Sequence, residues 1–261
     1  MGVRTERRGQ TLVIWLDRPE KRNAMSREMA EGLERAIEEM ESDDGIRAGV
    51  LTGAGPVFCA GTDLKDPRDK RTERGGEYGL LRRDRGTPLI AAVNGPALGG
   101  GFEIVLACDL IVMSEAATFG LPETRRGLAA TGGGLFRAPT SLPYHVALEM
   151  MLTGRAVTAA RAYALGLAAE VVPADEVLPA AMRLADEIAL GGPSGTAETL
   201  RAVRGFVGRD DHLGWWMTAR AKDAVVAHPD AAEGRAAFAE RRTPQWVYTS
   251  ALVPSPGGDP S

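Results

Sequence analysis

Short apolar runs alternate with helix-forming segments along the chain, and this alternation limits the possible folds more than any other feature. The runs AGVLTG (48–53), LIAAVNG (89–95) and DLIVMSE (109–115) predict short buried strands. A fourth run, TLVIWLDRP (11–19), alternates and ends at a proline, which also predicts a strand. Strands separated by helices predict an α/β architecture with parallel strand pairs.

The helix-forming segments lie between and after these runs. In SREMAEGLERAIEEMES, Met29, Leu33, Ile37 and Met40 recur at the spacing of one helix face. The glycines before Phe102 begin another predicted helix. Three more are predicted from LEMMLTG, TAARAYALG and LPAAMRLADEIAL.

The stretch GGPSG (191–195) is the clearest break in the chain. The segments AETLRAVRGFVG and LGWWMTARAKDAVVA that follow it are helical in pattern, with no strand between them. We therefore predict an α/β core over residues 1–192 and a helical region over 193–250. The remaining tail, 251–261, ends in PSPGGDPS and is predicted to be disordered.

The composition argues against several classes of protein. The 261 residues carry a net charge of −4, whereas nucleic-acid-binding domains are usually basic. No apolar run reaches the roughly 18 residues of a membrane span, and the start MGVRTERRGQ lacks the apolar stretch of a secretory signal. Cys59 and Cys108 predict buried thiols in a reducing compartment, and no cysteine–histidine spacing suggests a metal site. We expect a cytoplasmic protein that binds neither nucleic acid nor membrane.

The stretch NGPALGGGFEIVLACDL (94–110) combines two costly features. Consecutive glycines cost backbone entropy, and Glu103 is a single carboxylate within an apolar run. Together they indicate a functional site, although a tight strand-to-helix turn and an acid favoured by the helix dipole would also explain them. Glu123, in GLPE, taken alone is explained as a capping residue after Pro122.

The segment 63–87 is charged, broken by glycines and has little core-facing content. This composition suits a mobile loop over a site equally well as a solvated linker.

Four stretches occur in a characteristic order: RPEKRNAM, GPVFCAGTDLK, VNGPALGGGFEIVLACDL and ATFGLPETRRGL. Together they resemble the crotonase, or enoyl-CoA hydratase, superfamily, and AAEGRAAFAERRTPQW matches the way such chains end. The similarity runs from about Trp15 to Trp246. It implies an α/β crotonase (ClpP-like) fold of repeated ββα units with a helical C-terminal trimerisation layer. It also implies a homotrimer or homohexamer that binds an acyl-CoA thioester.

The resemblance assigns the chemistry to four residues. The backbone amides of Thr62 and Gly100 would form an oxyanion hole for the thioester oxygen. Glu103 would activate the water that attacks C3, and Glu123 would protonate C2. The two acids are twenty residues apart, so they meet only if the strand 109–115 returns the chain beside the helix. In a shared apolar pocket their like charges would then split their apparent pKa values.

The resemblance also implies a set of substrate- and coenzyme A-binding positions, which comprises Arg22, Ala24, Asp63, Leu64, Lys65 and Gly99. Arg22 and Ala24 bracket a turn expected to contact adenine, and Lys65 matches a position beside the ligand. Arg241 and Arg242 are either contacts to the coenzyme A phosphates or a solvated charge pair.

The implied reaction is the reversible addition of water across the 2,3 double bond of a 2-enoyl-CoA, which gives a 3-hydroxyacyl-CoA. Apart from the coenzyme A of the substrate, no cofactor or metal is expected. Ala130, Thr131, Leu135 and Phe136 depart from the usual family pattern around the acyl pocket, which leaves the acyl group and the direction of reaction open.

Three alternatives stand beside this hydratase hypothesis. An isomerase or a carnitinyl-CoA-type dehydratase would use the same fold, and family members that only isomerise commonly lack one of the two acids. A non-catalytic acyl-CoA-binding scaffold also predicts the loss of an acid, but this chain keeps both. A dinucleotide-binding oxidoreductase is disfavoured because the glycines are contiguous and are not spaced as G-x-G-x-x-G.

Overall fold

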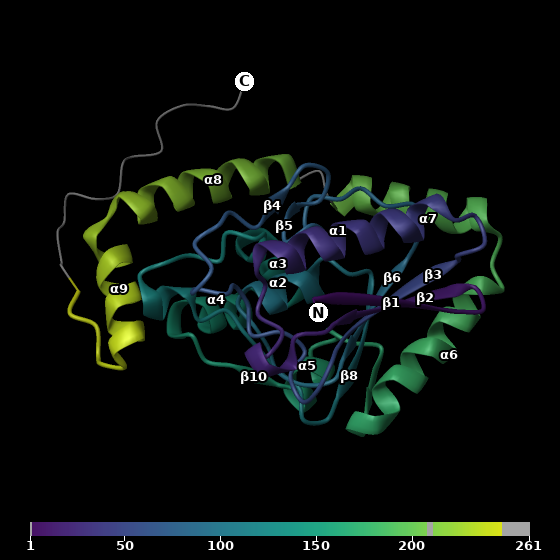
Figure 1. The fold of residues 1–261 in the computed structure, drawn as a ribbon, viewed down its shortest axis with the longest axis horizontal. Coiled ribbons are helices and arrows are strands. Elements are labelled where there is room, and N and C mark those ends of the chain that lie inside the picture. The colour runs from purple at the N-terminus through teal and green to yellow at the C-terminus, as the bar shows by residue number, and fades with distance from the viewer. Residues whose placement is uncertain (1, 208–210, 247–261) are drawn as a thin grey trace.

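A six-stranded sheet forms the centre of the protein, described here by a computed structural model over residues 2–207 and 211–246 (Figure 1). Its strands, in spatial order, are β1 (Val3–Arg8), β2 (Thr11–Leu16), β3 (Ala48–Gly53), β6 (Leu89–Val93), β8 (Leu110–Ser114) and β11 (Glu170–Val172). The first two pair as an antiparallel hairpin, and every later neighbour is parallel. This confirms the α/β prediction, with strands at each of the four predicted runs.

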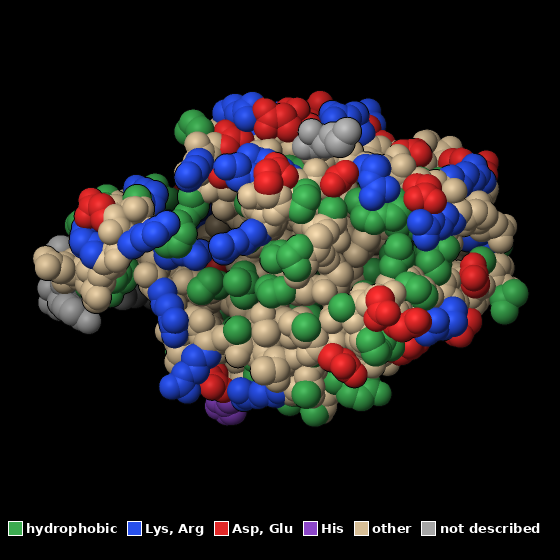
Figure 2. Space-filling model, turned by 60° about the horizontal axis from the view of Figure 1, so that its bottom comes forward, with side chains coloured by type: hydrophobic (Ala, Val, Ile, Leu, Met, Phe, Trp, Pro, Cys, Tyr) green, Lys and Arg blue, Asp and Glu red, His purple; other side chains and the backbone are tan. Residues whose placement is uncertain are grey.

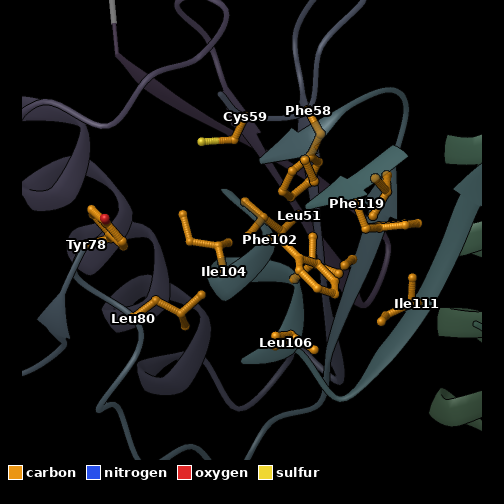
Figure 3. Close-up of a cluster of buried hydrophobic side chains, with 14 of the residues drawn as sticks. Leu51, Phe58, Cys59, Tyr78, Leu80, Phe102, Ile104, Leu106, Ile111 and Phe119 are labelled. Carbon is orange, nitrogen blue, oxygen red and sulfur yellow. The ribbon is translucent and has the colours of Figure 1, made fainter. Parts of the chain in front are cut away.

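Helices cover both faces of the central part of this sheet, which explains why β2, β3 and β6 are buried along their whole length, whereas the edge strand β1 is charged and mostly exposed. On β3, Val50 packs with the face that α6 (Val177–Ala189) covers, whereas Leu51 belongs to the main core. Helix α1 (Arg27–Ser42) lies on that other face and buries Leu33 in the main core. Figure 3 shows part of this main core, in which the rings of Phe58, Phe102 and Phe119 gather.

A second, smaller sheet positions the two segments that carry Glu103 and Glu123. It contains β7 (Ala97–Leu98), β9 (Thr118–Gly120) and β10 (Val157–Thr158), and β7 and β9 run parallel. Helix α2 (Gly100–Leu106) follows β7 almost at once, and the 3-10 helix η2 (Glu123–Arg126) follows β9. After β8 the chain leaves the large sheet and enters β9. This strand returns the chain beside the start of α2, as the meeting of the two acids requires.

The other helices follow the predicted order. They are α3 (Gly134–Ser141), α4 (Tyr144–Thr153), α5 (Ala159–Ala164), α7 (Pro193–Val207), α8 (Asp211–Ala227) and α9 (Pro229–Glu240), with short 3-10 turns η1 (Pro19–Lys21) and η3 (Ala174–Glu176). In Figure 1, α8 and α9 form an arm that projects from the body. The predicted helical C-terminal region is confirmed over 193–207 and 211–240, while the predicted tail lies outside the described residues and the division into domains stays a prediction. Within the described ranges, no helix is long and apolar enough to cross a membrane.

Two expectations about local structure were wrong. The break at 191–195 is shorter than predicted, because α7 already begins at Pro193, a residue that suits the first turn of a helix. The segment 63–87 is not poor in core contacts. It forms the hairpin β4 (Arg71–Thr72) and β5 (Gly76–Glu77), and the residues that follow are buried, namely Tyr78, Leu80 and Leu81.

Asp109 ties α7 to the core. Its carboxylate accepts hydrogen bonds from the Leu89 amide at 2.8 Å and from the Arg85 guanidinium at 3.0 Å, and Nε of Arg204 on α7 donates to it at 3.1 Å. Burial raises the pKa of Asp109, but the two arginines outweigh this effect and hold the pKa below its ordinary value. The carboxylate is therefore charged, and Arg85, only 5% exposed, depends on it.

Replacing Asp109 with alanine would leave the buried guanidinium of Arg85 without its carboxylate. We expect the free energy of unfolding to fall by about 3–5 kcal/mol, measured by urea denaturation followed by circular dichroism. Asp84→Ala, which removes an exposed carboxylate nearby, should change it by less than about 0.5 kcal/mol. Equal stabilities for the two variants would show that the cluster does not anchor α7.

Candidate active site

Glu103 lies in the first turn of α2 and is 2% exposed. Its Oε1 accepts two backbone hydrogen bonds, from Gly132 at 2.6 Å and from Gly134 at 2.9 Å. These donors belong to the turn that precedes α3, so the carboxyl group is held by a segment about thirty residues away in the chain, not by its own helix. Gly132 has to be glycine, since a Cβ there would collide with Oε2 of Glu103.

Glu123 opens η2 and faces the start of α2 from the other side. A Cβ built on Gly99 would lie 3.0 Å from Oε1 of Glu123, so the glycine leaves room for the acid. Within the described part of the chain, Oε2 of Glu123 is buried and has no hydrogen-bond partner. A buried carboxyl oxygen without a partner is costly in a purely structural role, which favours a functional one.

The two carboxyl groups influence each other. Burial raises the pKa of Glu103, and the negative charge of Glu123 raises it further, while the two backbone donors oppose the change. Burial also raises the pKa of Glu123. The pair therefore avoids carrying two charges at neutral pH, as the sequence predicted for two acids in one pocket.

Gly61, in GPVFCAGTDLK, allows two chain segments to approach closely. The amide of Leu98 donates to the carbonyl of Cys59 at 3.0 Å. A Cβ on Gly61, which has a φ of +92°, would lie 3.2 Å from the amide nitrogen of Gly100. Thr62 and Gly100 are therefore neighbours in space. Neither amide donates a hydrogen bond to another group in residues 2–207 and 211–246, so both donors are available to a ligand.

A pocket of about 180 Å³ opens beside these groups. Thr62, Tyr78, Thr131 and Gly132 line it together with charged residues of the 68–77 segment and Lys222 of α8. Figure 2 shows the surface hollowed between the body and the projecting arm, with Lys and Arg side chains gathered beside the hollow. The lining residues other than Gly132 carry charged or hydroxyl-bearing side chains, and Thr131 among them is one of the positions that depart from the family pattern.

The predicted coenzyme A-binding positions lie on adjoining segments. The carbonyl of Arg22 accepts from the Ala60 amide at 3.0 Å, and the Asp63 amide donates to Met25 at 2.9 Å. The turn containing Ala24 is thereby placed beside residues 60–65, among them Leu64, which is 45% exposed, and Lys65, also exposed.

Two of the predicted binding residues already have protein partners. The carboxylate of Asp63 accepts from Arg18 at 2.7 Å. Arg242 pairs with Glu233 at 2.9 Å and also with Glu240, which fits the solvated charge pair better than a phosphate contact. Arg241 ends α9 in a left-handed conformation.

Tyr78 is a residue of this site that the sequence did not reveal. Its hydroxyl lies 2.6 Å from the hydroxyl of Thr62, and its ring packs against Gly100. The available signal was GGEYG, in which an aromatic residue stands among glycines, because that arrangement favours a tightly turned backbone.

The raised pKa of Glu103 predicts a pH-dependent cost in stability. Unfolding returns the group to its ordinary pKa of 4.5, so above that pH the unfolded state releases a proton that the folded state retains, and stability falls as pH rises toward the folded pKa. Glu103→Gln removes this cost. We expect its melting temperature to exceed the wild type by roughly 3–8 °C near pH 8 and by little near pH 5. Glu115→Gln, at an exposed position, should follow the wild type at both. A gain of equal size at both pH values would contradict the assignment.

Comparison with known proteins identifies the family to which the chain belongs. A model of the enoyl-CoA hydratase/isomerase family matches residues 6–248. The chain is 40% identical to an enoyl-CoA hydratase of Mycobacterium tuberculosis, with 92% of this chain and 94% of that protein covered. It is 38% identical to a carnitinyl-CoA dehydratase of Proteus mirabilis, with 92% and 95% covered.

Solved structures give the same result. A carnitinyl-CoA dehydratase structure from Mycobacterium avium is 45% identical, with a TM-score of 0.87 and 94% of this chain and 98% of that chain covered. A carnitinyl-CoA hydratase structure from the same species has a TM-score of 0.88 at 40% identity, with the same coverage. The crotonase fold expected from the motifs is thus confirmed, and the chain belongs to the enoyl-CoA hydratase/isomerase family.

Proposed function

We propose that this protein is an enoyl-CoA hydratase, which adds water reversibly across the 2,3 double bond of a 2-enoyl-CoA. The observation that carries the proposal is the convergence of two buried carboxyl groups, Glu103 and Glu123, whose pKa values burial raises, beside two amides that no protein acceptor uses within the described residues. Family members that only isomerise commonly lack one of the acids, so the presence of both favours hydration.

In the proposed mechanism the thioester oxygen accepts hydrogen bonds from the amides of Thr62 and Gly100. As water adds to C3, negative charge collects on this oxygen, and the two preorganised donors stabilise it more strongly than they stabilise the ground state. The enolate that forms then takes a proton at C2.

The two acids divide the proton transfers. The coupled pair shares a proton, and the step starts from the form in which Glu123 carries it. In that form the carboxylate of Glu103, oriented by the two backbone bonds to Oε1, accepts a proton from the attacking water. Oε2 of Glu123 has no partner among the described residues, which suits a carboxyl group that carries a proton and delivers it to C2. In dehydration the same two steps run in reverse.

The proposal needs no cofactor beyond the coenzyme A of the substrate. The adjoining turns at 22–25 and 60–65 would hold its adenine, and the exposed Lys65 would face its phosphates. Since burial raises the pKa of the Cys59 thiol to about 12, that thiol is unreactive at neutral pH. The free thiols at 59 and 108 suit the cytoplasmic location expected from the sequence.

The same site also suits a carnitinyl-CoA-type dehydratase, and one observation favours keeping this second candidate. The pocket is lined by charged and hydroxyl-bearing side chains, including Thr62 and Thr131. Such a lining suits a polar acyl group better than a long aliphatic chain. The two candidates share the acids and the oxyanion hole and differ only in the acyl group and the favoured direction.

The first test follows the absorbance of the conjugated thioester of crotonyl-CoA after addition of the protein. We expect wild type to remove this absorbance and both Glu103→Gln and Glu123→Gln to lose roughly 10²–10⁴-fold in kcat. Glu115→Gln is the matched control at an exposed position. The same variants are then tested on carnitinyl-CoA.

The outcomes separate the candidates. Turnover of crotonyl-CoA by wild type and its loss in both variants supports the hydratase. Turnover of carnitinyl-CoA alone supports the dehydratase. Binding of both thioesters without turnover of either would contradict both candidates and favour the acyl-CoA-binding scaffold.

We further propose that the protein assembles as a homotrimer, or as a hexamer built from two trimers. Exposed apolar side chains concentrate on α7 and α8, where Val203, Phe206, Leu213 and Met217 are 47–80% exposed. A run of this kind on the surface of one chain indicates an interface.

Phe206→Glu places a charge in the middle of this apolar run. We expect sedimentation equilibrium to give three or six chains for the wild type and a smaller species for Phe206→Glu. Arg201→Glu, an exposed change on the same helix, should leave the assembly intact. A monomeric wild type would contradict the proposal.

A further inference from the structure

Tyr78 touches both residues whose amides form the proposed oxyanion hole. Its hydroxyl lies 2.6 Å from Oγ1 of Thr62. Its ring covers Gly100 so closely that a Cβ there would lie 2.6 Å from the ring carbon Cζ. Figure 3 shows Tyr78 at one edge of the buried cluster, away from Phe119 and Ile111. The ring thus lies at the edge of the main core, and its hydroxyl is directed to the candidate site.

The backbone is built to hold Tyr78 in this place. Tyr78 has a φ of +57°, a conformation that a bulky residue rarely adopts and that concentrates at functional sites. Its amide donates to the carbonyl of Lys70 at 2.9 Å. Next to it, Gly79 fits directly against the carbonyl of Ala30 in α1, where no side chain could be accommodated. The ring is 8% exposed and has little freedom to move.

The hydroxyl of Tyr78 keeps its proton. Burial raises its pKa, and the charges of Glu103 and Glu123 raise it further, against a smaller opposing effect of the Thr62 hydroxyl. The group is thus an O–H donor at neutral pH. Its present partner, the hydroxyl of Thr62, can exchange for a stronger acceptor because a hydroxyl can act as either donor or acceptor.

We propose that Tyr78 is a third hydrogen-bond donor to the thioester oxygen, beside the amides of Thr62 and Gly100. On binding, its O–H turns from Oγ1 of Thr62 to the carbonyl oxygen of the substrate. The bond strengthens as negative charge develops on that oxygen, so it contributes mainly to kcat. This inference rests on the proposed function, since it assumes an acyl-CoA thioester seated at the two amides.

The test compares wild type with Tyr78→Phe, which removes only the hydroxyl. Butyryl-CoA labelled with ¹³C at the thioester carbonyl is the probe, because its saturated chain cannot be hydrated. We expect its C=O stretch, followed by infrared difference spectroscopy, to move to lower frequency on wild type and to move less on Tyr78→Phe. With crotonyl-CoA, kcat should fall on the order of 10²-fold while KM changes by less than about threefold. A purely structural tyrosine would not alter the carbonyl frequency.

A control variant accompanies this comparison. Tyr163→Phe removes a phenol that is 52% exposed and should change nothing. If Tyr78→Phe does not fold, incorporation of 3,5-difluorotyrosine at position 78 provides a more acidic donor, and the carbonyl shift should then increase.

The failures are distinguishable. A wild type that hydrates crotonyl-CoA and a Tyr78→Phe variant with the same kcat and the same carbonyl shift would overturn the role of Tyr78 alone. An unchanged shift with difluorotyrosine would do the same. A wild type that binds butyryl-CoA with a Tyr78-dependent shift but hydrates nothing would overturn the hydratase proposal and leave the hydrogen bond established.

Discussion

The parallel pairing of β7 with β9 is the contact on which the candidate site depends. Gly99, at the end of β7, donates its amide to the carbonyl of Gly120 at the end of β9, at 2.8 Å. Beyond these two residues the chain turns into α2 on one side and η2 on the other, which brings Glu103 and Glu123 to the same place. The rings of Phe102 and Phe119 pack beneath the pair with their centroids 5.2 Å apart. A shift of register by one residue would reverse the faces and separate the acids.

The candidate site lowers the stability of the folded protein, so the rest of the structure has to compensate for it. Two buried carboxyl groups with raised pKa values cost stability at neutral pH. The compensation at the site is partial: two backbone bonds and the charge of Arg137 favour the carboxylate of Glu103, and the charge of Arg126 favours that of Glu123, whose Oε2 has no hydrogen-bond partner among the described residues. The remaining compensation lies in the large sheet, whose central strands β3 and β6 are buried on both faces. Such a site is tolerated because the core, which takes no part in the chemistry, supplies the stability that the site costs.

The sequence predicted those parts that local patterns determine. The four strands, the helix at Met29 and the glycine-rich approach at Gly100 follow from periodicity and backbone geometry. The resemblance to a family then named Glu103 and Glu123, which local structural explanations alone would have left ambiguous. The 63–87 segment was misjudged because its few apolar residues are separated by charged ones. The glycines of GGEYG indicate a tight turn, but they do not show that this turn directs Tyr78 inward.

The departures from the family pattern have a structural explanation of their own. Phe136, at the start of α3, packs edge-on against Trp215 of α8 with the ring centroids 5.2 Å apart, and Gly214 leaves room for it. Arg137, next in the chain, donates to the carbonyl of Leu81 at 2.9 Å and so ties α3 to the loop that carries Tyr78.

The turn before α3 therefore has two neighbours that fix it, and this same turn supplies the amides that hold Glu103. Helix α8 also places Lys222 at the pocket. Helix α8, which the sequence predicts to belong to an assembly layer, is thus in direct contact with α3, whose first residue donates to the carboxyl group of Glu103, the proposed general base. Because protein interiors are closely packed, the orientation of this carboxyl group depends on how α8 packs against Phe136.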